Sequence, residues 1–247
     1  MAKGLAVKFS SYEKTVPALL KVIKLEEELK HHNKIVLKPF LRDDSTDFTS
    51  PLFLEAVLKF CMEHKNPGAS ILIAEGSEKD NTIDLFEEKG YKSIAEKYAV
   101  GLVDLNQTET QKIQDGEFLK FDSIMYPSVL QNSFIISLPK LADDEEFEML
   151  GSLSNMMGAF PAQHYSGLFS RNKSKIKNYP VKFVIHDILK CKMPDLAIVD
   201  ASSLGLLLAG KPFETDRHAA KLLNRDWKLI PHLRLVAESF HLEENKR

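Results

Sequence analysis

The chain has little cysteine, with only Cys61 and Cys191 among its 247 residues. The two cysteines lie far apart and in different predicted helices, so they match neither a disulfide framework nor a Cys-x-x-Cys metal or redox motif. No iron–sulfur cluster is therefore expected on this chain's own cysteines. Isolated thiols are typical of a reducing compartment, and we predict a cytoplasmic location.

Long hydrophobic runs are also absent. No stretch approaches the ~18 consecutive apolar residues that a transmembrane helix requires, so a membrane is not expected as a partner. The N-terminal MAKGLAVKFSS lacks the apolar centre of a signal peptide. Because no Gly/Ser-rich or Pro-rich linker interrupts the chain, we predict a single α/β domain over residues 1–247.

Neither sign of charge is in large excess. The chain has 33 Lys plus Arg against 35 Asp plus Glu, which gives a formal net charge of -2. Such a balance provides no long-range field to attract nucleic acid or an anionic membrane, and no basic-aromatic strand of the RNA-binding kind is present. Nucleic acid is therefore not expected as a partner, whereas a homo-oligomer is left open.

Short apolar runs alternate with amphipathic stretches along the chain. Strands are predicted at residues 5–9, 35–37, 69–76, 100–105, 133–140 and 195–201, with a further edge or hairpin strand at 117–122. Helices are predicted at residues 16–32, 50–65, 81–90, 93–99, 143–158, 180–192, 215–224 and 230–240. Because the strands are continuously apolar and are separated by helices, the pattern predicts an α/β fold, a mainly parallel sheet with helices on both faces.

Polar or charged residues follow five of the predicted strands. They are Lys38, Glu75 with Gly76 and Ser77, Asp104, Lys140 and Asp200. In a parallel sheet the carboxyl ends of the strands share one edge, where ligands bind. We expect Lys38 and Lys140 to hold a small anion there, or Glu75, Asp104 and Asp200 to bind a divalent metal ion. The same groups could instead pair as structural salt bridges.

The common catalytic motifs are absent or broken. GLLLAGKP at residues 205–212 imitates the phosphate-binding G-x-x-x-x-G-K-[ST], but Pro212 replaces the hydroxyl residue and removes an N–H group. No G-x-G-x-x-G motif occurs. His186 and the other histidines lack partners at zinc spacing, so surface or hydrogen-bonded structural roles are expected for them.

Several short motifs follow one another in an order that resembles a known family. They are KPF, TSP, IAEGS, VDLN, IISLPK, SNMMG, PDLAIVDA and TDRHAAKLL. Together they resemble the domain of unknown function 362 family over about residues 34–240. The matching residues are Lys38, Pro39, Thr49, Pro51, Glu75, Gly76, Ser77, Gly90, Tyr91, Asp104, Pro139, Lys140, Asn155, Gly158, Asp200 and Asp216.

The resemblance implies a cytosolic α/β protein and adds Asn155 to the candidate ligand-binding residues. Some family members are fused to iron–sulfur modules, but the resemblance implies no general reaction. The chain departs from the family where Ala142, Asp143 and Asp144 stand in place of a lysine, a threonine and a histidine, and where Ser154 stands in place of a lysine. Each lost charge-assisted hydrogen bond weakens an anion site by roughly 1.5–3 kcal/mol.

Two functions from different classes follow. The first is binding of a small anionic ligand or a metal ion at the carboxyl ends of the strands, with catalysis and cofactors left open. The second is a non-catalytic partner or regulatory protein with a degenerate site. An exposed, self-complementary apolar patch at LGLLLAG, residues 204–210, would favour the second function.

Overall fold

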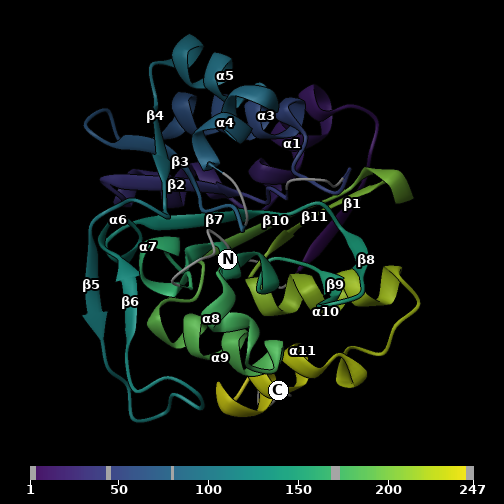
Figure 1. Ribbon diagram of the computed structural model, residues 1–247. Coiled ribbons are helices and arrows are strands. Elements are labelled where there is room, and N and C mark those ends of the chain that lie inside the picture. Colours follow the sequence, from purple (N-terminus) through teal and green to yellow (C-terminus); the bar gives the residue numbers. More distant parts are fainter. Residues whose placement is uncertain (1–3, 43–45, 79–80, 168–172, 243–247) are drawn as a thin grey trace.

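A seven-stranded sheet forms the centre of the computed structural model, which describes residues 4–42, 46–78, 81–167 and 173–242 (Figure 1). The strand order is β1-β11-β10-β7-β2-β3-β4. The bounds are β1 (Leu5–Lys8), β2 (Lys34–Pro39), β3 (Ser70–Glu75), β4 (Gly101–Asp104), β7 (Phe134–Leu138), β10 (Leu196–Ala201) and β11 (Leu206–Gly210). Only β11 runs against its neighbours, so the predicted mainly parallel sheet is confirmed.

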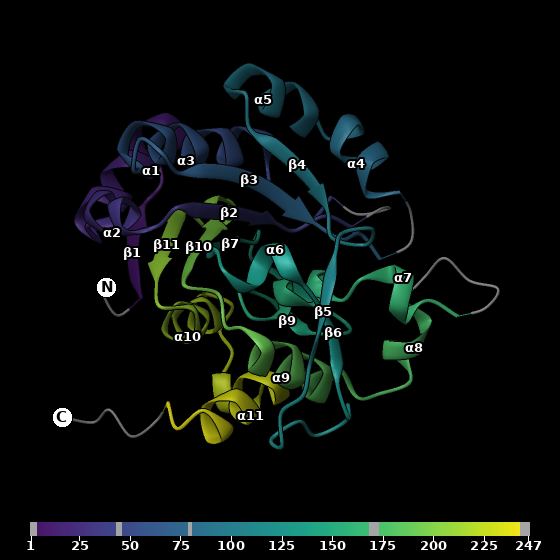
Figure 2. The same ribbon diagram turned by 90° about the vertical axis from the view of Figure 1, so that its left-hand side faces the viewer.

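Helices cover both faces of this sheet, as predicted (Figures 1 and 2). One face carries α1 (Tyr12–Val22), α2 (Leu25–Glu28), α3 (Pro51–His64), α4 (Thr82–Glu88) and α5 (Tyr91–Tyr98). The opposite face carries α9 (Val181–Cys191), α10 (Pro212–Leu222) and α11 (Pro231–Ser239). Within β2, Ile35 and Leu37 belong to the hydrophobic cluster on the α1–α5 face, whereas Val36 belongs to the cluster on the α9–α11 face. Successive side chains of a strand point to opposite faces.

The remaining elements are short. They are the sheet of β5 (Thr110–Ile113) and β6 (Ile124–Pro127), the sheet of β8 (Ala142–Asp144) and β9 (Glu148–Leu150), the helical turns α6 (Ser128–Gln131), α7 (Ala162–Tyr165) and α8 (Ser174–Lys177), and the 3₁₀ helices η1 (Leu29–His31), η2 (Ser154–Ala159), η3 (Ser202–Leu204) and η4 (Trp227–Leu229). Five of them, β8, β9, η2, α7 and α8, lie in the connection from β7 to α9. The site described below lies against η2.

The predicted helix at 143–158 is wrong, because this segment forms the β8–β9 hairpin and then η2. Asp144 Oδ1 accepts the N–H groups of Glu146 and Phe147, which closes a tight turn instead of a helical one. Farther along, the carboxylate of Asp216 accepts the N–H groups of Ser152 and Leu153. Side chains thus take the backbone donors that a continuous helix would use.

Two other segments also differ from prediction. Residues 117–122 form no strand, because Asp187 accepts the N–H groups of residues 119–121. The chain turns at Gly205, with φ of 74°, and returns along β10 as the unpredicted strand β11. Leu207, Leu208 and Ala209 are fully buried there, so LGLLLAG is not an exposed apolar patch.

The first long predicted helix is interrupted. Residues 16–32 were expected to form one helix, whereas α1 begins at Tyr12 and the backbone reverses at Lys24, with φ of 59°, before α2. Pro17 consequently lies inside α1 and not in its first turn. In the described parts of the chain, no helix has the length and apolar character needed to cross a membrane.

Candidate functional site

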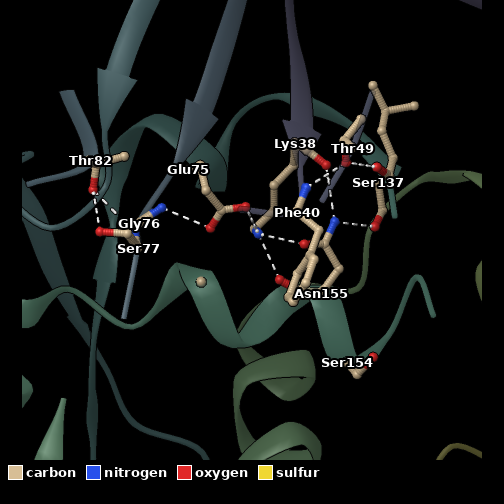
Figure 3. A network of polar contacts seen from close by, with 12 residues as sticks. Lys38, Phe40, Thr49, Glu75, Gly76, Ser77, Thr82, Ser137, Ser154 and Asn155 are labelled. Atoms are coloured by element: carbon tan, nitrogen blue, oxygen red, sulfur yellow. Dashed lines mark hydrogen bonds and ion pairs between the residues drawn. The ribbon is translucent and has the colours of Figure 1, made fainter. Parts of the chain in front are cut away.

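A buried ion pair joins the carboxyl ends of two neighbouring parallel strands. Lys38 is the fifth residue of β2 and Glu75 is the last residue of β3, and Lys38 Nζ lies 2.8 Å from Glu75 Oε2 (Figure 3). Lys38 is fully buried and Glu75 is 2% exposed. Burial lowers the pKa of Lys38 and raises the pKa of Glu75, and the attraction between the two charges opposes both shifts.

The hydrogen bonds of Lys38 identify it as an ammonium group. Its Nζ donates to Glu75 Oε2, to the Asn155 carbonyl oxygen at 2.6 Å and to Asn155 Oδ1 at 3.1 Å. Asn155 Nδ2 donates to the carbonyl oxygen of Lys38 and to Ser137 Oγ, which turns Oδ1 toward the lysine (Figure 3). Three acceptors use all three N–H donors, so Lys38 has none left for a ligand.

The segment that follows Lys38 is fixed by two other residues from the family pattern. Thr49 Oγ1 donates to the Leu138 carbonyl oxygen and accepts the N–H group of Phe40 at 2.8 Å. The hydroxyl of the buried Tyr91 donates to the carbonyl oxygen of Thr49. These bonds connect β2, β7 and α5, and they account structurally for Thr49 and Tyr91 without placing either at a ligand.

Two glycines let the backbone approach the ion pair. A Cβ atom at Gly158, in η2, would lie 1.8 Å from Glu75 Oε1 and 2.8 Å from Lys38 Nζ. A Cβ atom at Gly76 would lie 2.5 Å from the Gly158 carbonyl oxygen. Glu75 Oε1 in turn accepts the N–H group of Gly76 at 2.8 Å. A side chain at either position would separate η2 from the end of β3.

A cavity of about 60 Å³ opens beside this cluster. Its wall combines charged and apolar side chains. The charged residues are Arg42, Glu75, Glu78, Glu146, Lys173 and Lys177, and the apolar ones include Phe40, Phe147, Met157, Ile176 and Val184. Gly76, Asn155 and Gly158 complete the wall next to the ion pair. The cavity thus lies at the carboxyl ends of β2 and β3, where a parallel sheet binds ligands.

Lys173 is the second buried lysine of this site, and it is bonded differently. It is 2% exposed, and its Nζ donates to the carbonyl oxygens of Gly76 at 2.9 Å and Gly158 at 3.2 Å. Glu75 already binds Lys38 and the Gly76 N–H, and no carboxylate of the described residues pairs with Lys173. Burial lowers the pKa of Lys173 to about 7, although the negative charge of Glu75 acts against the shift.

The other charged groups around the cavity are largely paired. Arg42 lies 2.6 Å from Asp144, and Lys177 forms an ion pair with Glu78. Asp144, which the resemblance suggested stands in place of a histidine, therefore neutralises a neighbouring arginine. Asp143 likewise lies 2.8 Å from Arg225.

Three predicted site residues lie outside this cluster. Lys140 pairs with Asp47 at 2.9 Å, and Asp200 accepts a 2.7 Å hydrogen bond from the Tyr12 hydroxyl. Asp104 lies opposite Glu75 in the β3–β4 register, but its Oδ1 accepts the N–H group of Asn106. None of the three lines the cavity.

The predicted metal ligands are not assembled into one centre. In residues 4–42, 46–78, 81–167 and 173–242, no three His, Cys, Asp or Glu side chains are grouped so that they could hold a metal ion. Ser77, which was predicted as a ligand-binding residue, is buried behind the cavity wall and hydrogen-bonds to Thr82. Of the predicted residues, Glu75, Gly76 and Asn155 line the cavity and Lys38 supports it.

Ser239, His186 and Asp187 form a row of hydrogen bonds outside the cavity, in the serine–histidine–aspartate order found in serine hydrolases. His186 Nε2 lies 2.7 Å from Ser239 Oγ, and His186 Nδ1 lies 2.7 Å from Asp187 Oδ1. Asp187 also holds the N–H groups of residues 119–121, and Ser239 is the last residue of α11, at the helix end that presents carbonyl oxygens and not N–H groups. An oxyanion requires N–H donors, so we interpret this row of hydrogen bonds as a structural connection between α9, α11 and residues 119–121.

Sequence reasoning missed Lys173 and Asn106. Lys173 lies in a stretch without periodicity, and only the folded chain brings it to the end of β3. Asn106 Nδ2 donates to the Ser77 carbonyl oxygen at 2.9 Å, and its Oδ1 accepts the N–H group of Ala162. Its position directly after the VDL strand was the one available signal, because polar residues at strand ends had already been singled out.

The comparison with protein families gives one match. The family model described as domain of unknown function (DUF362) matches residues 35–212, which include Lys38, Glu75, Asn155 and Lys173. Asp216 lies beyond the matched region. No curated protein matches the chain.

Proposed function

The chain belongs to the DUF362 family, and from that premise we propose that it binds a small, singly charged anion in the cavity beside β2 and β3. A short carboxylate is the ligand class that fits best. Lys173 supplies the positive charge, whereas Lys38, Glu75 and Asn155 hold the wall in place. The sequence also led us to expect anion binding at this edge of the sheet, but with Lys38 and Lys140 as the residues that hold the anion.

The observation that carries the proposal is the imbalance of charge in the buried cluster. Lys38 and Glu75 neutralise each other at 2.8 Å, and Lys173 is left without a carboxylate partner in the described part of the chain. A buried cation is costly unless an anion compensates it, and its pKa falls in consequence. An anion that enters the cavity would restore the positive form of Lys173.

The remaining side chains restrict the size and charge of the ligand. A cavity of about 60 Å³ admits only a small molecule. Glu78 and Glu146 also line it, and their negative charge disfavours an anion with two or more charges. Phe147, Met157 and Val184 offer an apolar wall to a short hydrocarbon chain. These features favour a monocarboxylate over a phosphate ester or a metal ion.

Thermal unfolding with acetate as the probe tests the proposal. At a concentration of ~10 times Kd, a ligand stabilises the folded state by about 1.4 kcal/mol, which raises Tm by about 3–5 °C in a chain of this size. Lys173→Met should abolish this rise, because methionine fills similar space without the charge. The matched control is Lys175→Met, which removes an exposed lysine two residues away and should leave the rise intact.

The control salt is sodium chloride at the same ionic strength. If acetate and chloride give the same Tm in the wild type, or if Lys173→Met retains the acetate effect, anion binding at this cavity is refuted. We also propose a cytoplasmic location, which is supported by Cys61 and Cys191 being free, buried thiols in separate hydrophobic clusters.

A further inference from the structure

We propose that Lys173 is a nucleophilic amine that forms an imine with a small aldehyde or 2-oxo acid bound in the cavity. This inference rests on the proposed function, since the carboxylate of an oxo acid is the anion that would enter. The protonated fraction of Lys173 attracts that carboxylate, and the unprotonated fraction reacts with the carbonyl group. Imine formation adds a covalent step that anion binding alone does not require. Nothing in the family match suggests this step.

The first argument is the number of hydrogen-bond acceptors at each lysine. Lys38 Nζ has three acceptors, which suits the three N–H groups of an ammonium ion. Lys173 Nζ has two, the carbonyl oxygens of Gly76 and Gly158, which suit the two N–H groups of a neutral amine. Neither of these contacts donates a hydrogen bond to the lone pair of that amine. The lone pair is therefore available to attack a carbonyl carbon.

The second argument is the surroundings of the amine. Lys173 is 2% exposed, yet it lines a cavity, so its amine is largely shielded from solvent and still borders a space that a small molecule can enter. Burial lowers its pKa to about 7, so that far more of the amine is unprotonated near neutral pH than in an ordinary lysine. An ordinary lysine is almost entirely protonated there and reacts slowly.

The imine forms through a carbinolamine intermediate. The nitrogen lone pair of Lys173 attacks the carbonyl carbon, and a proton moves from nitrogen to the former carbonyl oxygen to give a carbinolamine. The C–O bond then breaks and water leaves, with one proton supplied to the hydroxyl group and one lost from nitrogen. Glu146 lines the same cavity, and its partial burial together with the charge of Glu78 raises its pKa, so we assign the exchange of these protons to Glu146.

Reductive trapping tests the inference with glyoxylate, the smallest 2-oxo acid, as the probe. The full chain is incubated with glyoxylate and cyanoborohydride at pH 7, and modified lysines are located by peptide mass spectrometry. The reductant adds hydride to the imine carbon and leaves a stable secondary amine. We expect Lys173 to be modified at least ~10-fold faster than Lys175, because far more of its amine is neutral at this pH.

Two variants locate the adduct, and the wild type separates this inference from the proposed function. Lys173→Arg has no primary amine and forms no imine under these conditions, so the adduct should be lost. Lys175→Arg should leave the trapping at Lys173 unchanged. Acetate stabilisation of the wild type without faster trapping at Lys173 would overturn the imine but not the binding site, whereas absence of both effects would overturn both proposals.

Discussion

At the scale of single residues, Lys38 has a structural role that differs from that of Lys173. Lys38→Met leaves the Glu75 carboxylate buried without a partner, which should lower the free energy of unfolding by about 3–5 kcal/mol at pH 8. The loss should shrink in acid, because a protonated Glu75 carries no charge. Chemical denaturation at pH 5 and pH 8 measures both effects.

The matched control for this change is Lys140→Met. Lys140 forms a partly exposed ion pair with Asp47 at 2.9 Å, with 30% of the lysine side chain exposed. Partly exposed pairs of this kind contribute about 0–1 kcal/mol. If Lys38→Met and Lys140→Met lowered the free energy of unfolding equally, the buried ion pair of Lys38 and Glu75 would not stabilise the fold as we infer.

Gly158 gives a second prediction at this scale. In Gly158→Ala the new methyl group would lie 1.8 Å from Glu75 Oε1, so η2 must move away from β3. Overpacking of this kind typically costs about 1–3 kcal/mol, and Tm should fall accordingly. Gly116→Ala is the control, because its methyl group meets no atom within 4 Å. A Tm equal to that of the wild type for Gly158→Ala would contradict the close approach.

At the scale of elements, one buried carboxylate connects α10 to the start of η2. Asp216 accepts hydrogen bonds from the N–H and hydroxyl groups of Ser152 and from the Leu153 N–H, all within 2.9 Å. No positively charged group takes part in these bonds. Burial therefore raises the pKa of Asp216 to about 6, despite the N–H donors.

This shift predicts a pH dependence of stability. A carboxyl group whose pKa is raised by folding binds its proton more tightly in the folded state, so its favourable contribution is complete in acid and is lost as the pH rises through 6. Relative to Asp216→Asn, the free energy of unfolding of the wild type should fall by about 2 kcal/mol from pH 4 to pH 7. If the free energies of unfolding of the wild type and Asp216→Asn changed equally with pH, the raised pKa of Asp216 would be contradicted.

At the scale of the whole molecule, the apolar strand pattern predicted the sheet and its two helical layers. Runs such as Ile35–Leu37 and Leu196–Val199 are buried on both faces, and that burial is visible in the sequence itself. The hairpin at 142–150 and the irregular segment at 117–122 were not predictable, because Arg225 and Asp187 hold them from far along the chain. Strand β11 was missed because its residues were considered only as a loop motif and as an apolar surface patch.

Part of the site was also predictable from the sequence. Strand ends pointed to Lys38 and Glu75, because adjacent parallel strands bring their carboxyl ends together. The same rule does not say which way each side chain turns, and Lys140 and Asp200 bind Asp47 and Tyr12 instead. Lys173 follows no strand, so no rule about strand ends could have found it.

Lys173 is a buried amine without a charged partner among the described residues, and it lies beside the cavity that we propose binds an anion. NMR titration of the lysine side-chain signals, with Lys173→Met to assign the resonance, tests this most directly. The account predicts a midpoint of about 7 for Lys173 and an upward shift of that midpoint when acetate is added. A midpoint near the ordinary lysine value of 10.5, unchanged by acetate, would contradict it.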